Sequence, residues 1–375
     1  MGPAVTNPAK IVAITGANGA LGRYASLYFR HHRGLEVVEL DRAAYNTPDR
    51  LQDAVARADA ILHFAGMNRA PDAEILAGNQ MLAQMLVDAL RISRATPHVI
   101  YASSTHESRD NAYGRSKRIA GDVLAAWAST AGGRFTRLVL PHIYSELVRP
   151  NYNSGIATFC HAVATGGEPH LDVDAEITPL HASEVCAVIA GVLDGPGATT
   201  VSPVGRPTRM SDLLADITAM HDLYRQRLIV PDVRRPDQLH LFNTYRAHLY
   251  AEAKATPLTL HSDDRGNLFE AVKELNGGQT FISTTRPGIT RGNHFHFHKV
   301  ERFCVLRGEA IIRMRRMSDD RLLAFQVSGD QPCFVDMPTL WTHNITNTGS
   351  GELLTLFWAH EIFNPEATDT YPVTV

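Results

Sequence analysis

Three histidines and a glutamate lie close together in the C-terminal third of the chain. His294, His296, His298 and Glu301 fall within eight residues, and His343 follows further along. Because side chains on a β-strand repeat every two residues, the first three histidines would share one strand face. Imidazole and carboxylate ligands suit zinc, nickel, iron or manganese. The sequence therefore predicts a metal site or a proton-transfer site near the C-terminus.

A glycine-rich loop near the N-terminus indicates a second kind of chemistry. An apolar run, residues 11–14, leads into Gly16, Gly19 and Gly22, and a helical pattern follows. Glycines at these positions allow a tight turn and bring backbone N–H groups close to a pyrophosphate, and the helix N-terminus adds its positive dipole end. A glycine triplet alone is a weak signal, but here both the strand and the helix are present. We expect dinucleotide binding by Gly16, Asn18, Gly19, Leu21 and Gly22.

Further cofactor contacts are predicted at the ends of the next two strands. Asp41 follows the glycine loop by about 20 residues, where an acid usually hydrogen-bonds the ribose 2′-hydroxyl of NAD. Arg42 comes next, and an arginine there can hold the 2′-phosphate of NADP, so the choice between NAD and NADP stays open. Ala65 and Gly66 end the following strand, at the rim where the nicotinamide ribose would lie. Asn79, in the next helix, is interpreted as a surface amide.

Ser104, Tyr113 and Lys117 form a candidate catalytic set. Tyr113 and Lys117 are four residues apart, a spacing that places both on one face of a helix. Lys117 could stabilise the Tyr113 phenolate and bond the cofactor ribose, and a lowered phenol pKa would let Tyr113 exchange a proton with a carbonyl or alcohol. Ser104 ends a strand and would hydrogen-bond the same oxygen. This set predicts hydride transfer between a nicotinamide and a carbonyl carbon.

Two different patterns of elements must position these groups. From residue 10 to about 220, short apolar runs alternate with helical patterns, as in a parallel sheet with right-handed crossovers. After about residue 257, short β-rich segments follow one another with turn residues between them, which indicates a small antiparallel barrel or sandwich. We expect an α/β fold in which residues 1–250 form a Rossmann-type doubly wound parallel sheet and residues 251–375 form an all-β domain.

Length and composition exclude several classes of protein. The chain has 375 residues, 44% of them hydrophobic and 20% charged, which fits two domains of an ordinary globular protein. A net charge of -3 gives no basic surface for nucleic acid. No apolar run approaches the ~20 residues that cross a bilayer. The four cysteines form no CxxC pair. We therefore expect free thiols and a cytoplasmic protein with neither a membrane nor a nucleic-acid partner.

The N-terminal motifs resemble those of the extended short-chain dehydrogenase/reductases. The resemblance is carried by Thr15-Gly16-x-x-Gly19-x-x-Gly22, His63-x-Ala65-Gly66, Ser104 and Tyr113-x-x-x-Lys117. It implies a Rossmann domain that modifies nucleotide-sugars.

The C-terminal motifs resemble two related families. Gly292-x-His294-x-His296-x4-Glu301-x6-Gly308 and Pro338-x4-His343-x3-Asn347 are similar to the two cupin motifs. This implies that His294, His296, Glu301 and His343 bind a divalent metal, and that His298 supports them from the same strand face. The segments Asp263–Glu270 and Arg291-Gly292-Asn-His294 also resemble the sugar-nucleotide 3,5-epimerases, in which this histidine is the base. His294 is therefore either a ligand or a base, and the sequence leaves both roles open.

Along nearly its whole length the chain is similar to the CapF-like bifunctional UDP-sugar epimerase/reductases. Matching elements include Pro150-Asn-Tyr-Asn-Ser154, Asp264-Arg-Gly266 and Thr342-His-Asn-Ile345. The resemblance implies a zinc-bearing homodimer. Its cupin domain would epimerise C3 of a UDP-4-keto-6-deoxy (2-acetamido) sugar, and its Rossmann domain would reduce the C4 ketone with NADPH. It also implies that Asn151, Asn153 and Arg265 contact the UDP-sugar.

Two alternatives remain open at this point. In the first, the chain is a keto-sugar reductase whose cupin serves only structure or dimerisation. In the second, it is a nucleotide-binding sensor without catalysis. Asp41 stands where the CapF-like family has a non-acidic residue, so the preference for NADH or NADPH also stays open.

Overall fold

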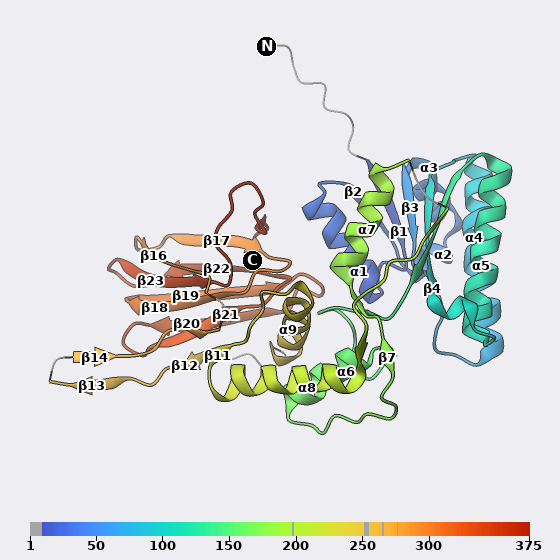
Figure 1. Cartoon of the computed structure of the whole chain (residues 1–375). Helices are drawn as coiled ribbons and strands as arrows, with labels where there is room; N and C mark the ends of the chain where they lie inside the picture. Colours follow the sequence, from blue (N-terminus) through green and yellow to red (C-terminus); the bar gives the residue numbers. More distant parts are fainter. Residues whose placement is uncertain (1–9, 197–198, 251–254, 265, 276) are drawn as a thin grey trace, which may run out of the picture. The chain divides into compact units, whose positions relative to one another are not determined.

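The chain forms two compact units (Figure 1). The computed structural model describes residues 10–196, 199–250, 255–264, 266–275 and 277–375. Contacts between Cα atoms place Met1–Val148 and Ala175–Thr208 in the first unit and Arg149–Asp174 and Arg209–Val375 in the second. Residues 209–250 thus pack with the C-terminal β elements, although their helical pattern groups them with the N-terminal half of the sequence. The domain boundary at residue 250 stays a prediction.

The first unit is built on a six-stranded parallel sheet. Its strand order is β2-β1-β3-β4-β5-β9, and all the pairings are parallel, which confirms the Rossmann-type sheet. The strands are β1 (Ile11–Thr15), β2 (Glu36–Leu40), β3 (Ala60–His63), β4 (His98–Ser104), β5 (Arg134–Leu140) and β9 (Thr200–Val201). The strand order reverses at β1, so the carboxyl ends of β1 and β3 flank the place where open α/β sheets bind ligands.

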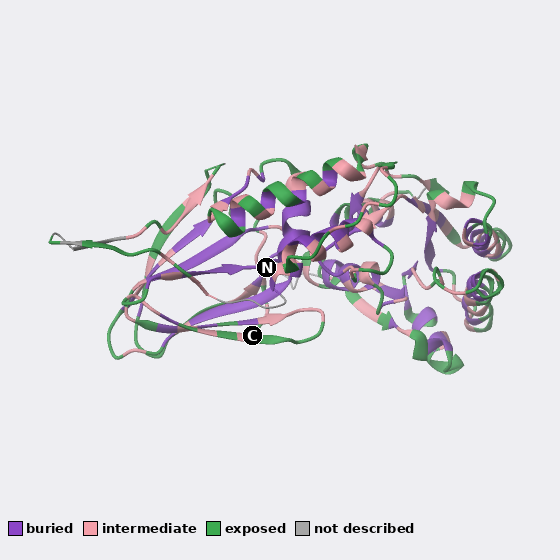
Figure 2. Ribbon diagram, turned by 90° about the horizontal axis from the view of Figure 1, so that it is seen from below, coloured by how far each residue is buried: buried purple, intermediate pink, exposed green. Residues whose placement is uncertain are grey.

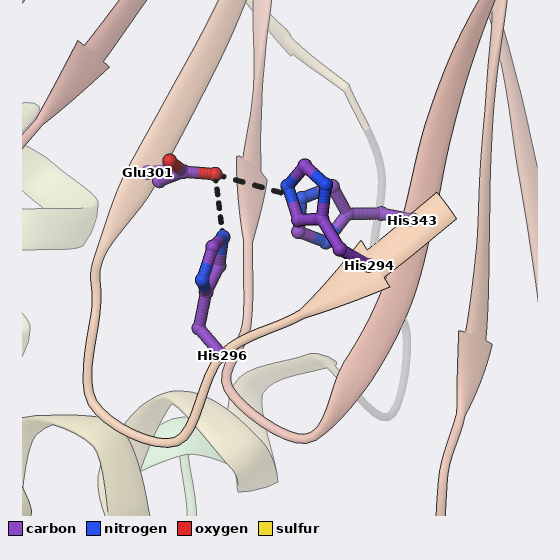
Figure 3. A group of neighbouring side chains, drawn as sticks. All are labelled: His294, His296, Glu301 and His343. Carbon is purple, nitrogen blue, oxygen red and sulfur yellow. Dashed lines mark hydrogen bonds and ion pairs between the residues drawn. The ribbon is translucent and has the colours of Figure 1, made fainter. Parts of the chain in front are cut away.

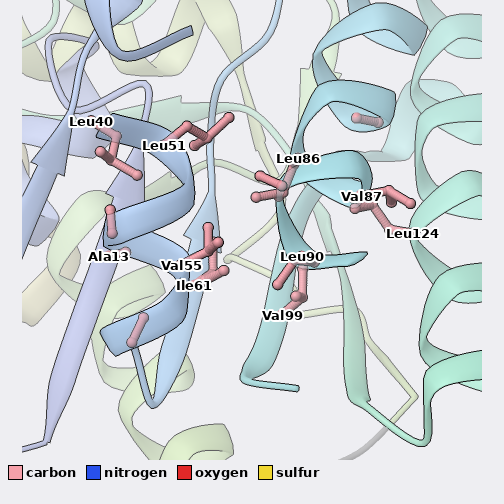
Figure 4. Packing of buried hydrophobic residues seen from close by; sticks show 14 of the residues in the cluster. Ala13, Leu40, Leu51, Val55, Ile61, Leu86, Val87, Leu90, Val99 and Leu124 are labelled. Atoms are coloured by element: carbon pink, nitrogen blue, oxygen red, sulfur yellow. The ribbon is translucent and has the colours of Figure 1, made fainter. Parts of the chain in front are cut away.

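Helices cover both faces of this sheet. Figure 1 shows α4 and α5 on one side and α1 and α7 on the other. All four residues of β3 are buried, as expected for a parallel strand covered on both faces. Figure 4 shows the packing of one face, where Leu86, Val87 and Leu90 of α4 meet Ile61 and Val99 of the sheet. The helical segments are α1 (Ala20–Leu27), η1 (Tyr28–His32), α2 (Arg42–Tyr45), α3 (Pro48–Arg57), α4 (Asp72–Ser93), η2 (Thr105–Ser108), α5 (Ala112–Ala131) and α7 (Ala182–Asp194). Two short strands, β6 (Ile143–Tyr144) and β8 (Leu180–His181), pair beside them.

The second unit contains two five-stranded antiparallel sheets. One has the order β12-β21-β18-β23-β16 and the other β20-β19-β22-β17-β24, which confirms the all-β C-terminal fold. The strands are β12 (Thr256–Pro257), β16 (Gln279–Thr285), β17 (Thr290–Phe295), β18 (Glu301–Arg307), β19 (Glu309–Arg316), β20 (Leu322–Ser328), β21 (Cys333–Met337), β22 (Trp341–Asn347), β23 (Leu353–Ala359) and β24 (Tyr371–Pro372). Their inward residues, among them Phe303, Ile312 and Ile345, form one apolar core. Figure 2 shows both buried and exposed strands, and β21 and β22 are the most completely buried.

Helices and short strands complete the second unit. They are α6 (Gly155–Thr165), α8 (Met210–His221), η3 (Asp222–Gln226), α9 (Pro236–Leu249), β11 (Ile229–Val230), β13 (His261–Asp263), β14 (Gly266–Leu268) and β15 (Lys273–Glu274). The strands β7 (Glu176–Ile177) and β10 (Thr208–Arg209) pair with each other. In the part of the chain that the structure describes, no helix combines the length and the apolar character needed to cross a bilayer.

A buried polar network joins η3 and α9 to the β-strands. Arg302 donates from Nε and Nη2 to the two carboxylate oxygens of Asp336, at 2.7 and 3.0 Å. The Tyr224 hydroxyl donates to the same carboxylate, and Arg246 Nη2 donates to the carbonyl of Met337 at 3.0 Å. These contacts hold the helices that precede the β-strands onto them, and so explain why residues 209–250 belong to the second unit.

Candidate active sites

The glycine loop closes tightly between β1 and α1. Gly16 has φ +69°, and a Cβ there would lie 2.7 Å from Ala65 N. A Cβ on Gly22 would lie 2.3 Å from the carbonyl oxygen of Gly16. Gly19 caps α1 and donates its N–H to the same oxygen at 2.9 Å. Gly16 and Gly22 therefore accept only glycine, and the three glycines leave the loop backbone and the helix N-terminus free of side chains, as pyrophosphate binding requires. Asn18 is exposed in this loop, and Leu21 is half-buried on the first helical turn.

Asn79 holds the segment after β3 in place. Its Oδ1 accepts the Met67 N–H at 2.6 Å, and its Nδ2 donates to the Met67 carbonyl and to Ser116 Oγ at 2.9 and 2.8 Å. The side chain is buried, so the interpretation of Asn79 as a surface amide was wrong. Gly78 and Asn79 both belong to the buried face of α4. The position of Asn79 on that face is the feature that could have identified it as an interior residue. The segment it fixes includes Gly66, where an added Cβ would meet Asn79 Oδ1 at 3.1 Å.

Asp41 is tied to a cation that the sequence reasoning missed. It caps α2 by accepting the Ala44 N–H at 3.2 Å, and it also accepts from Arg50 Nη1 at 3.1 Å. Arg42 is exposed at the first position of α2. Two arginines therefore flank the carboxylate that was expected at the adenosine ribose, and the preference between NAD and NADP stays a prediction.

Ser104, Tyr113 and Lys117 come together at the end of β4 and the first turns of α5. Asn111 starts α5 by accepting the Gly114 N–H at 2.7 Å. The Lys117 ammonium donates to the carbonyl of Ala102 at 2.8 Å and lies 6.0 Å from the centre of the Tyr113 ring. The predicted convergence of Tyr113 and Lys117 on one helix face is therefore present.

The pKa of Tyr113 differs from the expectation. Burial raises the pKa of Tyr113, and a hydrogen bond with Ser104 only partly opposes that rise. Lys117 does not lower it as expected, because its ammonium is held by a strand carbonyl. Burial lowers the pKa of Lys117 to about 8, although the charge of Glu107 acts in the opposite direction. Tyr113 thus stays protonated at neutral pH.

His294, His296, Glu301 and His343 converge in the second unit. Their candidate ligand atoms lie within 4.8 Å of one another. Figure 3 shows the side chains pointing together, with Glu301 Oε2 2.8 Å from His296 Nε2 and 3.5 Å from His343 Nε2. His294 comes from β17, His296 from the turn after it, Glu301 from β18 and His343 from β22. The predicted set is therefore assembled from both sheets.

Backbone carbonyls orient two of these imidazoles. His296 Nδ1 bonds the carbonyl of Asp369, and His343 Nδ1 bonds the carbonyl of Trp341 at 3.1 Å. A carbonyl oxygen only accepts, so each Nδ1 carries a hydrogen. His343 Nε2 then keeps its lone pair, and His296 Nε2 offers one to a cation when the proton that it donates to Glu301 is displaced. His343 Nε2 is buried and has no hydrogen-bond partner among the described residues. Two such lone pairs and a carboxylate fit a divalent metal, zinc among others.

The charges of the group also suit a cation. Burial, together with the neighbouring His343 and His296, lowers the pKa of His294 to about 3, and burial lowers the pKa of His343. Burial would raise the pKa of Glu301, but His296 holds it well below its usual range. Burial would lower the pKa of His296, but Glu301 raises it. Without a metal, the centre thus pairs a charged Glu301 carboxylate with a His296 ring that it favours in the charged form, beside neutral His294 and His343.

His298 does not join this centre, contrary to the expected strand alternation. β17 ends at Phe295, and a bend at residues 297–298 breaks the two-residue repeat. The His298 ring lies 5.5 Å from the ring of His240 on α9, and its carbonyl accepts from Asn243 Nδ2 at 2.9 Å. The prediction that His298 supports the metal ligands was therefore wrong.

The expected substrate contacts are only partly described. Asn151 and Asn153 are exposed in the turn before α6, and the Asn151 N–H donates to Thr158 Oγ1 at 3.0 Å. Arg265 lies outside the described residues. The roles of these three residues remain predictions.

Comparisons with known proteins agree with this architecture. Residues 12–196 match the NAD dependent epimerase/dehydratase family, and residues 261–371 match the polysaccharide biosynthesis C-terminal domain. The UDP-2-acetamido-2,6-beta-L-arabino-hexul-4-ose reductase of Pseudomonas aeruginosa is 31% identical over 97% of this chain and 98% of its own. The capsular polysaccharide assembling protein CapF of Staphylococcus aureus is 29% identical, with a TM-score of 0.61 over 97% of this chain and 100% of its own. The UDP-N-acetylglucosamine 4-epimerase of Bacillus cereus shares the fold, with a TM-score of 0.55, 17% identity and coverage of 66% and 99%.

The parallel sheet with its glycine loop and Tyr–Lys pair, followed by an antiparallel β unit, defines an NAD-dependent enzyme of the epimerase and reductase class. Within that class, the chain belongs to the CapF-like epimerase/reductase family.

Proposed function

We propose that this chain is a bifunctional nucleotide-sugar enzyme. Its C-terminal centre epimerises C3 of a UDP-4-keto-6-deoxy (2-acetamido) sugar, and its Rossmann domain reduces the C4 ketone with NADPH or NADH. The observation that carries the proposal is a Ser104-Tyr113-Lys117 set and a buried imidazole–carboxylate centre in one chain. The relative named as a UDP-hexulose reductase supports the substrate class. A cytoplasmic homodimer belongs to the same proposal.

Epimerisation begins with the acidity that the C4 ketone gives to the C3 proton. A neutral imidazole takes this proton, and a proton then returns to the opposite face of the resulting enolate. His294 is the only half-exposed imidazole of the three, which makes it the one most open to a substrate. His296, His343 and Glu301 hold their orientation through the contacts described above. His296, Glu301 and His343 would hold a divalent metal, which when bound would supply positive charge for the enolate oxygen.

Reduction follows in the Rossmann domain. The glycine loop would hold a nicotinamide cofactor, which when bound would supply the hydride for C4. Tyr113 gives its phenolic proton to the C4 oxygen, and its raised pKa keeps that proton in place at neutral pH. Ser104, hydrogen-bonded to Tyr113, orients the same oxygen. Once the ketone is gone the C3 proton is no longer acidic, so reduction traps the epimer.

Deuterium exchange separates the two steps. The protein is incubated in deuterated water with a UDP-2-acetamido-2,6-dideoxy-4-ketohexose and NADPH or NADH. Tyr113→Phe should abolish cofactor consumption but leave deuterium incorporation at C3. His343→Ala should abolish C3 exchange but leave reduction of the pre-epimerised ketone. Wild-type protein that neither consumes the cofactor nor exchanges C3 would contradict the proposal.

A second candidate is a reductase whose β domain has no catalytic role. The relative's name supports it, because that name mentions reduction alone. In this case wild-type protein would consume the cofactor with the pre-epimerised ketone and show no C3 exchange. His294→Ala and His343→Ala would then leave turnover unchanged.

A further inference from the structure

The last residues of the chain lie against the segment that carries His296. β24 pairs antiparallel with the end of β17, with Pro372 opposite His294 and Tyr371 opposite Phe295. The Val373 N–H then donates to the carbonyl of Asn293 at 2.9 Å. The C-terminal segment thus adds an edge strand directly beside the imidazole–carboxylate centre.

Asp369, just before β24, binds the turn after β17 through its carboxylate. Oδ1 accepts the Phe297 N–H at 3.0 Å, and Oδ2 accepts the His298 and Lys299 N–H groups at 2.6 and 2.8 Å. Three consecutive amides therefore converge on one anion, an arrangement in which backbone dipoles stabilise negative charge. The carboxylate fixes the course of the chain between His296 and Glu301.

The same residue also fixes the ring of His296. The carbonyl oxygen of Asp369 accepts from His296 Nδ1, so Nε2 points at Glu301 Oε2, 2.8 Å away. His343 takes its orientation from Trp341, two residues away on its own strand. His296 takes its orientation from a residue 73 positions away. Its geometry therefore depends on the C-terminal segment.

We propose that Asp369 is a positioning residue of the imidazole–carboxylate centre. Its carboxylate holds the 297–299 turn and its carbonyl holds His296 Nδ1–H, so that Nε2 is presented to a divalent cation. The use of this arrangement in catalysis rests on the proposed epimerase function. The arrangement itself is independent of it, because it concerns cation affinity and ring orientation.

The experiment compares wild type, Asp369→Asn and Asp369→Ala with a matched control, Asp319→Ala. Asp319 also stabilises a turn of the second unit, accepting from Arg316 Nε at 2.7 Å and from the Arg321 N–H at 3.3 Å. Two quantities are measured in the full-length protein. One is the Zn²⁺ dissociation constant, obtained by competition with a chromophoric chelator. The other is the pair of ¹⁵N shifts of the His296 ring, recorded with and without Zn²⁺.

Asp369→Ala keeps the backbone carbonyl but removes the carboxylate that holds the 297–299 turn in place. It should therefore weaken Zn²⁺ binding by about 10- to 100-fold, the usual effect of disturbing a group that orients a metal ligand. Asp369→Asn should fall between it and wild type, because an amide oxygen still accepts some of the N–H groups. With Zn²⁺ bound, the wild-type shifts should report hydrogen on Nδ1 alone. Without Zn²⁺ they should report hydrogen on both ring nitrogens, because Asp369 and Glu301 each accept from the ring. The alanine variant should show a mixture of tautomers in both conditions. Asp319→Ala should keep the wild-type dissociation constant within about twofold and leave the shifts unchanged.

Wild-type affinity and shifts in both Asp369 variants would overturn the proposal, and so would an equal loss of affinity in Asp319→Ala. If Asp369→Ala does not fold, Asp369→Asn decides through the same two measurements. If wild type binds no Zn²⁺, the shifts of the metal-free proteins decide. Failure of the proposed function would give a different result. Wild type and the Asp369 variants would then bind Zn²⁺ in the predicted order of affinity, but wild type would show no C3 exchange.

Discussion

The ion pair between Arg302 and Asp336 gives a quantitative prediction for the second unit. The two side chains are 1% and 2% exposed, and the shortest contact is 2.7 Å. Asp336→Asn would leave the Arg302 guanidinium buried without its anion, with buried Arg246 nearby. Removing one partner of a buried pair costs about 3–5 kcal/mol. The unfolding equilibrium should therefore shift by roughly two to three and a half decades.

A second pair with the same chemistry provides the control. Arg315 and Asp320 approach to 2.6 Å, but Asp320 is 79% exposed. Exposed pairs contribute about 0–1 kcal/mol, so Asp320→Asn should change the stability little. Both variants are compared by the urea dependence of hydrogen exchange in peptides from β18 and β21, which report the second unit alone. If the two variants differ by less than about 1 kcal/mol, burial does not set the cost and the reasoning fails.

The same pair makes the stability depend on pH. Burial alone would raise the pKa of Asp336, but Arg302 holds it below its ordinary value. The folded state then binds fewer protons than the unfolded state. The contribution is therefore complete above the unfolded pKa of about 3.9 and is lost as the pH falls through the folded value. Acidification through this range should destabilise β18 and β21 in wild type more steeply than in Asp336→Asn.

Two further predictions concern the first unit. Gly22→Ala places a Cβ 2.3 Å from the Gly16 oxygen, so NAD(P)H binding in a fluorescence titration should weaken by roughly tenfold, in line with an overpacking cost of about 1–3 kcal/mol. Gly191→Ala on α7 meets no described atom within 4 Å and should leave binding unchanged; an equal loss there would contradict the steric reason. Lys117 has a pKa lowered by burial to about 8, so it loses its charge above that pH and the rate of ketone reduction should fall there. Lys117→Arg should move this decrease in rate to higher pH. A wild-type rate that stays constant up to pH 10.5 would show that loss of the Lys117 charge does not cause the decrease.

Local sequence patterns were enough to predict a parallel sheet followed by an antiparallel β fold, and to predict which side chains converge in each. The position of Gly22 is a local steric requirement, since a Cβ there would meet the carbonyl oxygen of Gly16 in the same loop. Tyr113 and Lys117 share a helix face because of their spacing alone. Parallel and antiparallel strands differ in the length and periodicity of what connects them. Information of this kind lies within a few residues of where it acts.

The sequence did not predict which distant elements and side chains contact one another. The helical pattern of α9 does not predict which β elements it packs against. Contacts such as those of Arg246 with Met337 and of Asn243 with His298 assign it to the second unit. Asp41 was predicted to contact the ribose because of its distance in sequence from the glycine loop. That distance gives no information about its contact with Arg50. His298 was placed by an alternation that holds only while the strand continues. The wrong placement of His298 came from extending this local rule past the end of β17.

The centre built from His296, Glu301 and His343 separates two kinds of prediction. The residues that supply ligand atoms can be predicted from the sequence, but the contacts that orient those side chains cannot. A histidine or glutamate is visible in a sequence as a chemical type, and its spacing suggests a shared site. The groups that orient His296 and His343 are the carbonyl oxygens of Asp369 and Trp341. Every residue carries such an oxygen, so no residue pattern marks it. Only the pairing of β24 with β17 brings the Asp369 carbonyl to the ring, which makes the C-terminal strand part of the centre's chemistry.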